Sequence, residues 1–430
     1  MQTLKAESLL RFLDDSPCNF LAVNTIRTHL EENGFVELDL SDVWNLEKGG
    51  KYFVVKNHSA IFGFTIGSKP ISEQGFKIIA AHSDSPGFRI KPNPEMTGDG
   101  VVRLNTEVYG GPILYTWFDR PLSIAGRVIL RNAENPLKPI TKLIHIKEPL
   151  LIIPHLAIHF NRAVNDGNKL SKQKDMLPVA AIIKDSIESK DMLLNKVSEE
   201  LGVGKDEILD FDLMLYNCQK AERVGFNKEF VASGRIDDLS MAHAAMCALI
   251  DGTDKDSTNV MAIFDNEETG SGTKQGAASP VLANILHRIA LCTGIDQEGF
   301  YRAIANTFMI SADNAHAAHP NYPEKYDPTN HPKMGGGPTI KINANCKYMT
   351  DANSSAIFIE LCKKVGSPYQ FFVNHSDNAG GSTLGNILTS QIDIAGVDMG
   401  NPIWAMHSAI ETGSLKDHEN AIKVFTGFFS

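Results

Sequence analysis

The sequence lacks long apolar runs, closely paired cysteines and an excess of positive charge. No run of about 18 apolar residues occurs, so we expect no membrane-spanning helix. The six cysteines are scattered and include no C-x-x-C pair, which is typical of reduced thiols rather than of a disulfide framework. The N-terminal residues include acidic side chains and no apolar stretch of the signal-peptide type. We therefore expect a cytoplasmic protein.

Negative charge predominates instead. Lys and Arg number 41, Asp and Glu number 51, and the formal net charge is −10. An acidic chain is a poor partner for nucleic acid or for an anionic membrane, so we expect neither. The 430 residues are too many for one small core. They predict two domains, or one domain with a large insert.

Short apolar runs alternate with amphipathic segments near both ends of the chain. A helix is predicted from Ser16-Pro17, with Ser16 as its N-cap, to Gly34. The apolar runs with the pattern of central strands are 75–81, VMAIF, TFMISA and QIDIAGVD, and further helices are predicted at 240–251 and 278–292. This alternation predicts an α/β fold with a mixed sheet covered on both faces.

Residues 93–225 have a different pattern, because β-rich stretches replace the alternation of strands and helices. We predict that they form an inserted domain with its own core. The flanking segments 1–92 and 226–430 then form one discontinuous catalytic domain.

Side chains that commonly bind metals follow several of the apolar runs. They are His82 and Asp84 after FKIIAA, Asp237 in SGRIDDLS, Glu267 and Glu268 after VMAIFDN, Asp313 after TFMISA, and His407 in GNPIWAMHSAIE. Ligands of open α/β sheets bind beyond the carboxyl ends of the strands. We therefore expect these side chains to converge on one crevice.

Five of these residues are enough to hold two divalent cations, which need one bridging ligand and two further ligands each. The five are His82, Asp237, Glu268, Asp313 and His407, with Asp237 as the bridge. Imidazole and carboxylate ligands suit zinc, although manganese or cobalt would also fit. Glu267 is then available as the general base, and Asp84 can accept the second ring N–H of His82.

Each of these residues also has an ordinary explanation when it is taken alone. Asp238 can cap the helix that follows it, and Glu267 with Glu268 can be a solvated pair. The coincidence of metal-binding side chains at the ends of several apolar strands favours a site.

Five ordered motifs resemble the aspartyl aminopeptidase family, which includes yeast vacuolar aminopeptidase I. They are HSDSPG from His82, GRIDD to Asp238, DNEETGSGTKQGA from Asp265, SADNAHAAHPNY from Ser311, and AMHSAIE to Glu411. The segment TEVYGGPILYTWFDRPLSIAGRV shares the resemblance, which covers nearly the whole chain. It implies two zinc ions per subunit on the five ligands above, with Glu267 as the base.

The resemblance also implies a fold and an assembly. The fold is an α/β, mixed-sheet zinc exopeptidase catalytic domain with an inserted β-rich dimerisation domain. The subunits form a tetrahedral homo-dodecamer, in which a histidine of the inserted domain reaches a neighbour's active site. His159 is favoured for that role and His155 is the alternative; without the oligomer, both are simply strand histidines on one face.

Lys341, in GGPTIKIN, aligns with a lysine that in the family binds an acidic substrate side chain. A fixed ammonium favours Asp or Glu and rejects Lys or Arg, whereas a lysine at a strand edge usually faces water. The sequence thus predicts a zinc aminopeptidase that removes Asp or Glu from peptides with a free N-terminus. The alternatives are a broad-specificity co-catalytic zinc exopeptidase and a non-catalytic assembly or cargo protein.

Overall fold

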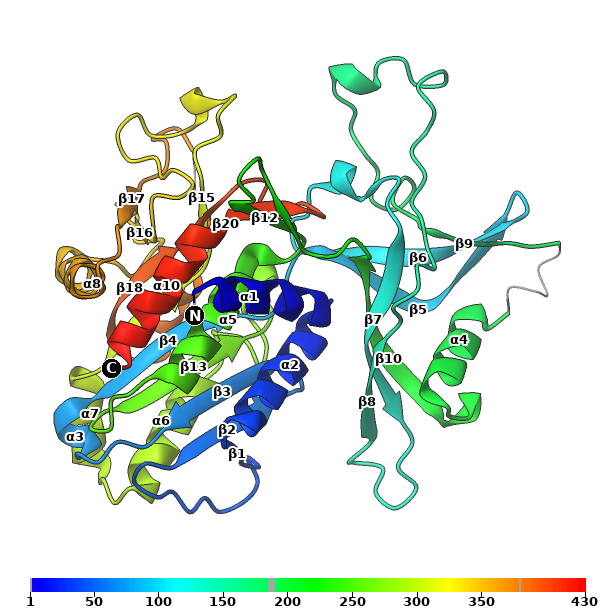
Figure 1. Ribbon diagram of the computed structural model, residues 1–430. Helices are drawn as coiled ribbons and strands as arrows, with labels where there is room; N and C mark the ends of the chain where they lie inside the picture. The colour runs from blue at the N-terminus through cyan, green and yellow to red at the C-terminus, as the bar shows by residue number, and fades with distance from the viewer. Residues whose placement is uncertain (1, 185–189, 379) are drawn as a thin grey trace. The chain divides into compact units, whose positions relative to one another are not determined.

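The computed structural model describes residues 2–184, 190–378 and 380–430 (Figure 1). The chain folds into two compact units. The first comprises Met1–Asp84, Ala221–Met406 and Glu411–Ser430, and the second comprises Ser85–Lys220 and His407–Ile410. The sequence pattern places the limits of the insert at 93 and 225 instead. Among the described residues, no helix has both the length and the apolar character needed to cross a membrane.

A nine-stranded mixed sheet lies at the centre of the first unit, in the order β1-β2-β3-β13-β4-β14-β18-β16-β17. Neighbours among β13, β4, β14 and β18 are parallel, whereas β3 is antiparallel to β13. The strands are β1 Val36–Glu37, β2 Lys51–Lys56, β3 Ala60–Thr65, β4 Phe76–His82, β13 Thr258–Phe264, β14 Phe308–Ala312, β16 Thr339–Lys341, β17 Gln370–Phe372 and β18 Ala395–Gly400.

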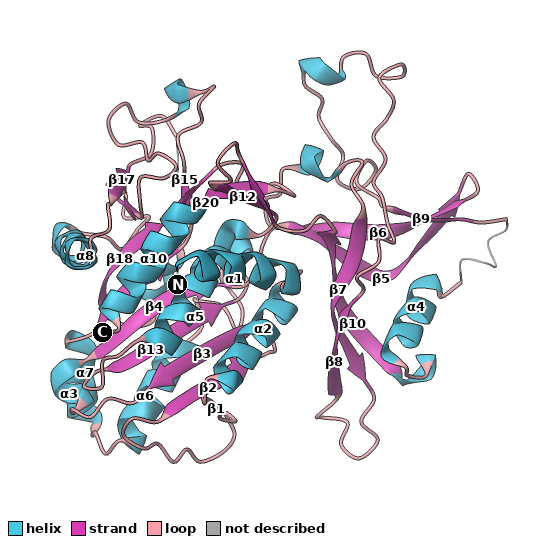
Figure 2. Ribbon diagram, in the orientation of Figure 1, coloured by secondary structure: helices cyan, strands magenta, loops and turns pink. Residues whose placement is uncertain are grey.

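Each face of this sheet carries its own apolar core, because successive side chains of a strand point to opposite faces. Ile79 and Ala81 of β4 belong to one core, and Ile78 and Ala80 belong to the other. Figure 2 shows helices on both sides of the sheet, which confirms the predicted α/β class with a mixed sheet. Burial on both faces explains why the central strands are continuous apolar runs in the sequence.

The first core includes residues of α1, α2, α5, α8 and α10, and the second includes residues of α3, α6, α7 and α9. The helices of the first unit are α1 Gln2–Asp15, α2 Asn19–Glu32, α3 Ile71–Gln74, α5 Ile236–Asp251, α6 Val281–Cys292, α7 Gln297–Ala305, α8 Ala352–Val365, α9 Leu384–Leu388 and α10 Leu415–Phe428. Two small sheets complete the unit: β11 Glu222–Val224, β12 Phe230–Ser233 and β20 Glu411–Ser414 in one, and β15 Ala315–His316 and β19 Pro402–Ile403 in the other.

Helix α2 begins later than the sequence predicts. Its N-cap is Cys18 and its first residue is Asn19, so the prediction that Ser16 caps it is wrong. The Asn19 side chain donates a hydrogen bond of 2.9 Å to Asp265 Oδ1. This contact between residues far apart in the chain is absent from the local pattern that predicts helix ends.

The second unit has a six-stranded antiparallel sheet in the order β8-β7-β10-β5-β6-β9. Asp99 and Gly100 connect β5 to β6 with φ of 54° and 75°, the left-handed conformation that a two-residue hairpin turn favours. The core of the unit includes Phe88, Trp117 and Val197. Its elements are β5 Gly87–Gly98, β6 Val101–Tyr109, β7 Leu122–Leu130, β8 Ile140–His145, β9 Val179–Ile182, α4 Met192–Leu201 and β10 Ile208–Asn217.

Candidate metal centre

The side chains of the first unit that could bind a metal ion lie at one edge of the nine-stranded sheet. Strand β4 ends at His82, and its parallel neighbour β14 is followed by Asp313. The other parallel neighbour, β13, ends at Phe264, and only Asp265 and Asn266 separate it from Glu267 and Glu268. Parallel strands end at the same edge, so the fold itself brings these side chains together.

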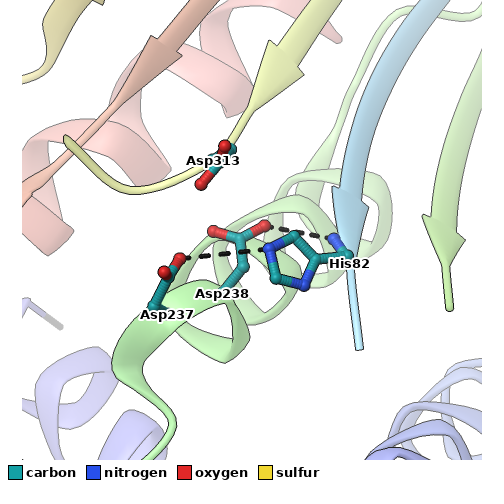
Figure 3. A group of neighbouring side chains, drawn as sticks. All are labelled: His82, Asp237, Asp238 and Asp313. Carbon is teal, nitrogen blue, oxygen red and sulfur yellow. Dashed lines mark hydrogen bonds and ion pairs between the residues drawn. The ribbon is translucent and has the colours of Figure 1, made fainter. Parts of the chain in front are cut away.

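A first cluster combines one imidazole with three carboxylates. Potential ligand atoms of His82, Asp237, Asp238 and Asp313 all lie within 4.8 Å of one another, and all four side chains are buried (Figure 3). The two consecutive aspartates come from the start of α5, where neither has helical φ and ψ. His82 Nε2 is 3.9 Å from Asp237 Oδ1, and the His82 backbone N–H donates to Asp238 Oδ2 at 3.1 Å.

A second cluster shares His82 and adds the two consecutive glutamates. Ligand atoms of His82, Glu267 and Glu268 also lie within 4.8 Å of one another. The buried Asp84 carboxylate holds this loop, because it accepts the backbone N–H groups of Glu267 at 3.1 Å and Glu268 at 3.2 Å. The same carboxylate is 3.3 Å from His82 Nδ1, which is also 3.0 Å from the Asp84 carbonyl oxygen.

The concentration of buried negative charge perturbs these groups. Burial, reinforced by neighbouring carboxylates, raises the pKa of Glu267 to about 8, although His82 opposes the shift. Burial also raises the pKa of Asp238 and of Asp313 above the usual value. Burial would lower the pKa of His82, but the charges of Asp238 and Asp84 outweigh it and raise that pKa well above its usual value. Buried acids that repel one another in this way favour a bound cation.

The cluster fits a divalent metal ion. Asp238 Oδ1 is buried and receives no hydrogen bond from the described part of the chain. A buried carboxylate oxygen without a donor is unfavourable unless a cation compensates it. One imidazole with several carboxylates is a donor set that suits zinc, and manganese or cobalt as well.

Lys341 is a buried cation beside this cluster. It lies at the end of β16, is 4% exposed, and its Nζ is 3.2 Å from Asp313 Oδ2. Burial would lower the pKa of Lys341, but Asp313 and other neighbouring groups hold it above the usual value. The side chain therefore keeps its positive charge and does not face water as a strand-edge lysine would.

The three predicted histidines of the second unit differ in their surroundings. His407 belongs to this unit, and its Nδ1 is 3.2 Å from the Gly111 carbonyl oxygen.

The segment with His155 and His159 is a loop and not a strand. The His155 ring packs on Phe118 with 4.6 Å between centroids, and its Nδ1 is 2.9 Å from the Leu156 carbonyl oxygen. His159 is exposed in a turn. The roles predicted for all three histidines remain predictions.

Asp238 is the one residue of the first cluster that the sequence does not assign to the site. Its carboxylate accepts the His82 N–H instead of capping the following helix, so the capping interpretation is wrong. The pair of consecutive aspartates is the only local signal, and it cannot show which carboxylate faces His82.

Comparisons with known proteins extend along the whole chain. A family model described as "Aminopeptidase I zinc metalloprotease (M18)" matches residues 12–429. A Clostridium novyi protein called "Probable M18 family aminopeptidase 2" is 51% identical over 426 residues, which cover 99% of this chain and 98% of the relative. A protein of the same name from Ectopseudomonas mendocina is 40% identical over 426 residues, with 99% and 97% covered.

Solved structures show the same fold. The cryo-EM structure of an Ape4 and Nbr1 complex matches with a TM-score of 0.95 and 34% identity, covering 100% of this chain and 86% of that one. The structure of an S. cerevisiae mApe1 dodecamer matches with a TM-score of 0.85 and 27% identity, covering 99% and 96%.

Proposed function

The chain belongs to the M18 family of zinc metallo-aminopeptidases, and from this premise we propose that it removes Asp and Glu from peptide N-termini with two zinc ions per subunit. The family resemblance of the five sequence motifs is confirmed, and so is the expectation of a peptide-hydrolysing enzyme. We propose, beyond the family, the substrate specificity, the number of zinc ions and the roles of individual residues.

Two ions are proposed because five ligands, one of them bridging, are enough to hold a pair of divalent cations. Potential ligand atoms of His82 lie within 4.8 Å of those of Asp237 and Asp313 in one cluster and of Glu268 in another. His82, Asp237, Glu268 and Asp313 are the proposed ligands of the first unit, with Asp237 as the bridge. His407 is proposed as the fifth ligand on the sequence motif alone. Asp238, whose carboxylate accepts the His82 N–H, is proposed to hold His82 in place.

The proposed chemistry is hydrolysis with Glu267 as the general base. Zinc, when bound, polarises a carbonyl group and lowers the pKa of water to about 7. Glu267 lies beside the proposed ligand Glu268, and a bound cation would favour its charged form, so that its carboxylate can take a proton and pass it to the leaving amine. The Asp84 carboxylate accepts the backbone N–H of Glu267 and so fixes the position of that residue. The same carboxylate lies beside His82 Nδ1 and orients the imidazole ring.

The acidic specificity rests on one observation, the buried ammonium of Lys341 at 3.2 Å from Asp313. If Asp313 binds a metal ion, its charge is shared with that ion and compensates Lys341 less. A desolvated ammonium then attracts a substrate carboxylate and repels a basic side chain. Lys341 is therefore proposed to bind the side chain of the N-terminal Asp or Glu.

A homo-oligomer is expected, because the relatives include a dodecameric structure. For this chain we propose the tetrahedral dodecamer, with residues 93–225 as the dimerisation domain. His159 is the better candidate to reach a neighbour's site, since it is exposed while the His155 ring is packed on Phe118. A cytoplasmic location is proposed from the six cysteines, all of which are free thiols.

The specificity is tested with aminoacyl-naphthylamides of Asp, Glu, Leu and Lys and the zinc-loaded enzyme. We expect the highest kcat/KM for Asp and Glu. Lys341→Met should lower kcat/KM for Asp by about 10- to 100-fold, the loss of one hydrogen bond to a charged group, and leave Leu within a few fold. A wild-type preference for Leu over Asp would refute the acidic specificity.

The base assignment is tested by Glu267→Gln, with Glu268→Gln as the matched variant. Glu267→Gln should lower kcat by about 100-fold or more and retain zinc, because the base binds no ion in this proposal. Glu268→Gln should lose zinc as well as activity. Metal analysis of both proteins separates the two roles, and an active Glu267→Gln enzyme would show that another group is the base.

A further inference from the structure

A cavity of about 520 Å³ lies in the first unit beside α6, away from the residues of the metal centre. Its lining includes Lys56 at the end of β2, Lys274, and His287 and Arg288 of α6. Leu40 and Ile285 contribute an apolar part of the wall. Figure 1 shows α6 beside β2 and the segment that follows β1. The volume is within the range of about 300–1,000 Å³ that is usual for small-molecule sites.

The lining has positive charge and no acidic side chain to balance it. Throughout residues 2–184, 190–378 and 380–430, no acidic side chain forms an ion pair with Lys56, Lys274 or Arg288. Lysine and arginine groups on a protein of net charge −10 normally find acidic neighbours. Three unpaired cations at one cavity therefore create a local positive potential that attracts anions.

Arg288 is held rigidly in the wall of this cavity. Its guanidinium donates to the carbonyl oxygens of Leu40 at 2.7 Å and Asp42 at 2.5 Å, and it lies 3.7 Å above the Trp44 ring. The neighbouring His287 ring contacts Phe300, and its buried Nε2 has no hydrogen-bond partner among the described residues. A fixed guanidinium beside Lys56 and Lys274 is prepared to bind an oxyanion with little loss of side-chain entropy.

We propose that this cavity binds a small organic anion, with a phosphate or carboxylate group on the basic residues and an apolar part against Leu40 and Ile285. The basic residues of the lining suit the anionic group, and the apolar residues suit the rest of the ligand. The cavity shares no residue with the metal centre, so its occupant is neither the substrate nor a metal ligand.

The position of Lys274 connects this site to the catalytic loop. Its neighbours hold Asn266, the residue before Glu267: Thr273 Oγ1 donates to Asn266 Oδ1 at 2.8 Å, and Gln275 Nε2 donates to the same oxygen at 2.9 Å. An anion that orders Lys274 thus acts on the segment that holds Asn266, the residue before Glu267.

The experiment is calorimetric titration of the zinc-loaded oligomer at constant ionic strength with three probes. Phenyl phosphate carries both halves of the proposed ligand, inorganic phosphate carries only the charge, and phenol carries only the ring. We expect phenyl phosphate to bind more tightly than phosphate and phenol not to bind. No detectable phenyl phosphate binding, or equal binding of phenol, would overturn the proposal.

Lys56→Gln with Lys274→Gln tests the location, and Lys364→Gln, an exposed lysine of α8, is the control. The double variant should weaken phenyl phosphate binding by about tenfold or more, while the control stays unchanged. Each single variant should show a smaller loss of affinity for phenyl phosphate, so the single variants still test the location if the double variant is unstable. Unchanged affinity in these variants would mean that the anion binds elsewhere, for example at the metal centre. Because binding is measured without peptide hydrolysis, the result is independent of the proposed function.

Discussion

Asp417 gives a pH-dependent contribution to stability that can be isolated by one substitution. It is fully buried in α10, and its carboxylate accepts hydrogen bonds of 2.7 Å from the backbone N–H groups of Gly335 and Gly337. Burial raises its pKa from 3.8 to about 6, although these bonds favour the charged form. We predict that Asp417→Asn removes this titration, because an amide does not ionise.

The magnitude follows from the difference between the folded and unfolded pKa values. Since the folded value is higher, the stabilising contribution is fully present below about pH 3.8 and is lost as the pH rises through about 6. The whole loss is about 3 kcal/mol, because a difference of one in pKa corresponds to about 1.4 kcal/mol. Between pH 5 and pH 7.5, about 1.4 kcal/mol of it is lost.

Urea unfolding of both proteins at pH 5, 6 and 7.5 measures this contribution. The free energy of unfolding of the wild type, relative to Asp417→Asn, should fall by about 1.4 kcal/mol from pH 5 to pH 7.5. Asp351→Asn is the control, because hydrogen bonds from Ser354 lower the pKa of Asp351 and its contribution is already complete at pH 5. A constant difference between wild type and Asp417→Asn over this range would refute the reasoning.

Three further predictions concern the site, the assembly and the core. Asp84→Asn should weaken zinc binding by about 10- to 100-fold, because it removes the charge that orients His82; competition with a chelator measures the affinity, and an unchanged value would contradict this role. His159→Ala should lower kcat of the oligomer while His155→Ala changes it little, which steady-state kinetics on both variants decides. Phe425→Ala, in the core against the sheet, should lower the free energy of unfolding by about 3–5 kcal/mol in urea titrations, and a loss below about 1 kcal/mol would show that the site can repack.

Much of the candidate site could be predicted from the sequence because its residues follow apolar strands. His82 and Asp313 directly follow such runs, and parallel strands end at one edge, so their proximity follows from the fold class. The role of Asp238 could not be predicted in this way. An aspartate at the start of a helix can cap the helix or face a neighbouring strand, and only the three-dimensional structure shows its contact with His82.

The strand order and one helix boundary were also beyond the local pattern. A continuous apolar run shows that β13 is buried on both faces, but it does not show that β13 lies between β3 and β4. The start of α2 coincides with the contact between Asn19 and Asp265. Both features depend on partners distant in the chain, and periodicity contains no information about them.

The order of the strands has a consequence for synthesis on the ribosome. Strand β4 is complete at His82, but its two neighbours β13 and β14 begin at Thr258 and Phe308, after the whole of the segment 85–220. At about 5–20 residues per second, more than two hundred residues keep β4 without β14 for roughly 10 to 45 seconds. Until β13 is complete at Phe264 both edges of this apolar strand are unpaired, and the edge that β14 covers stays unpaired for the whole time, so the nascent chain is exposed to aggregation through this strand.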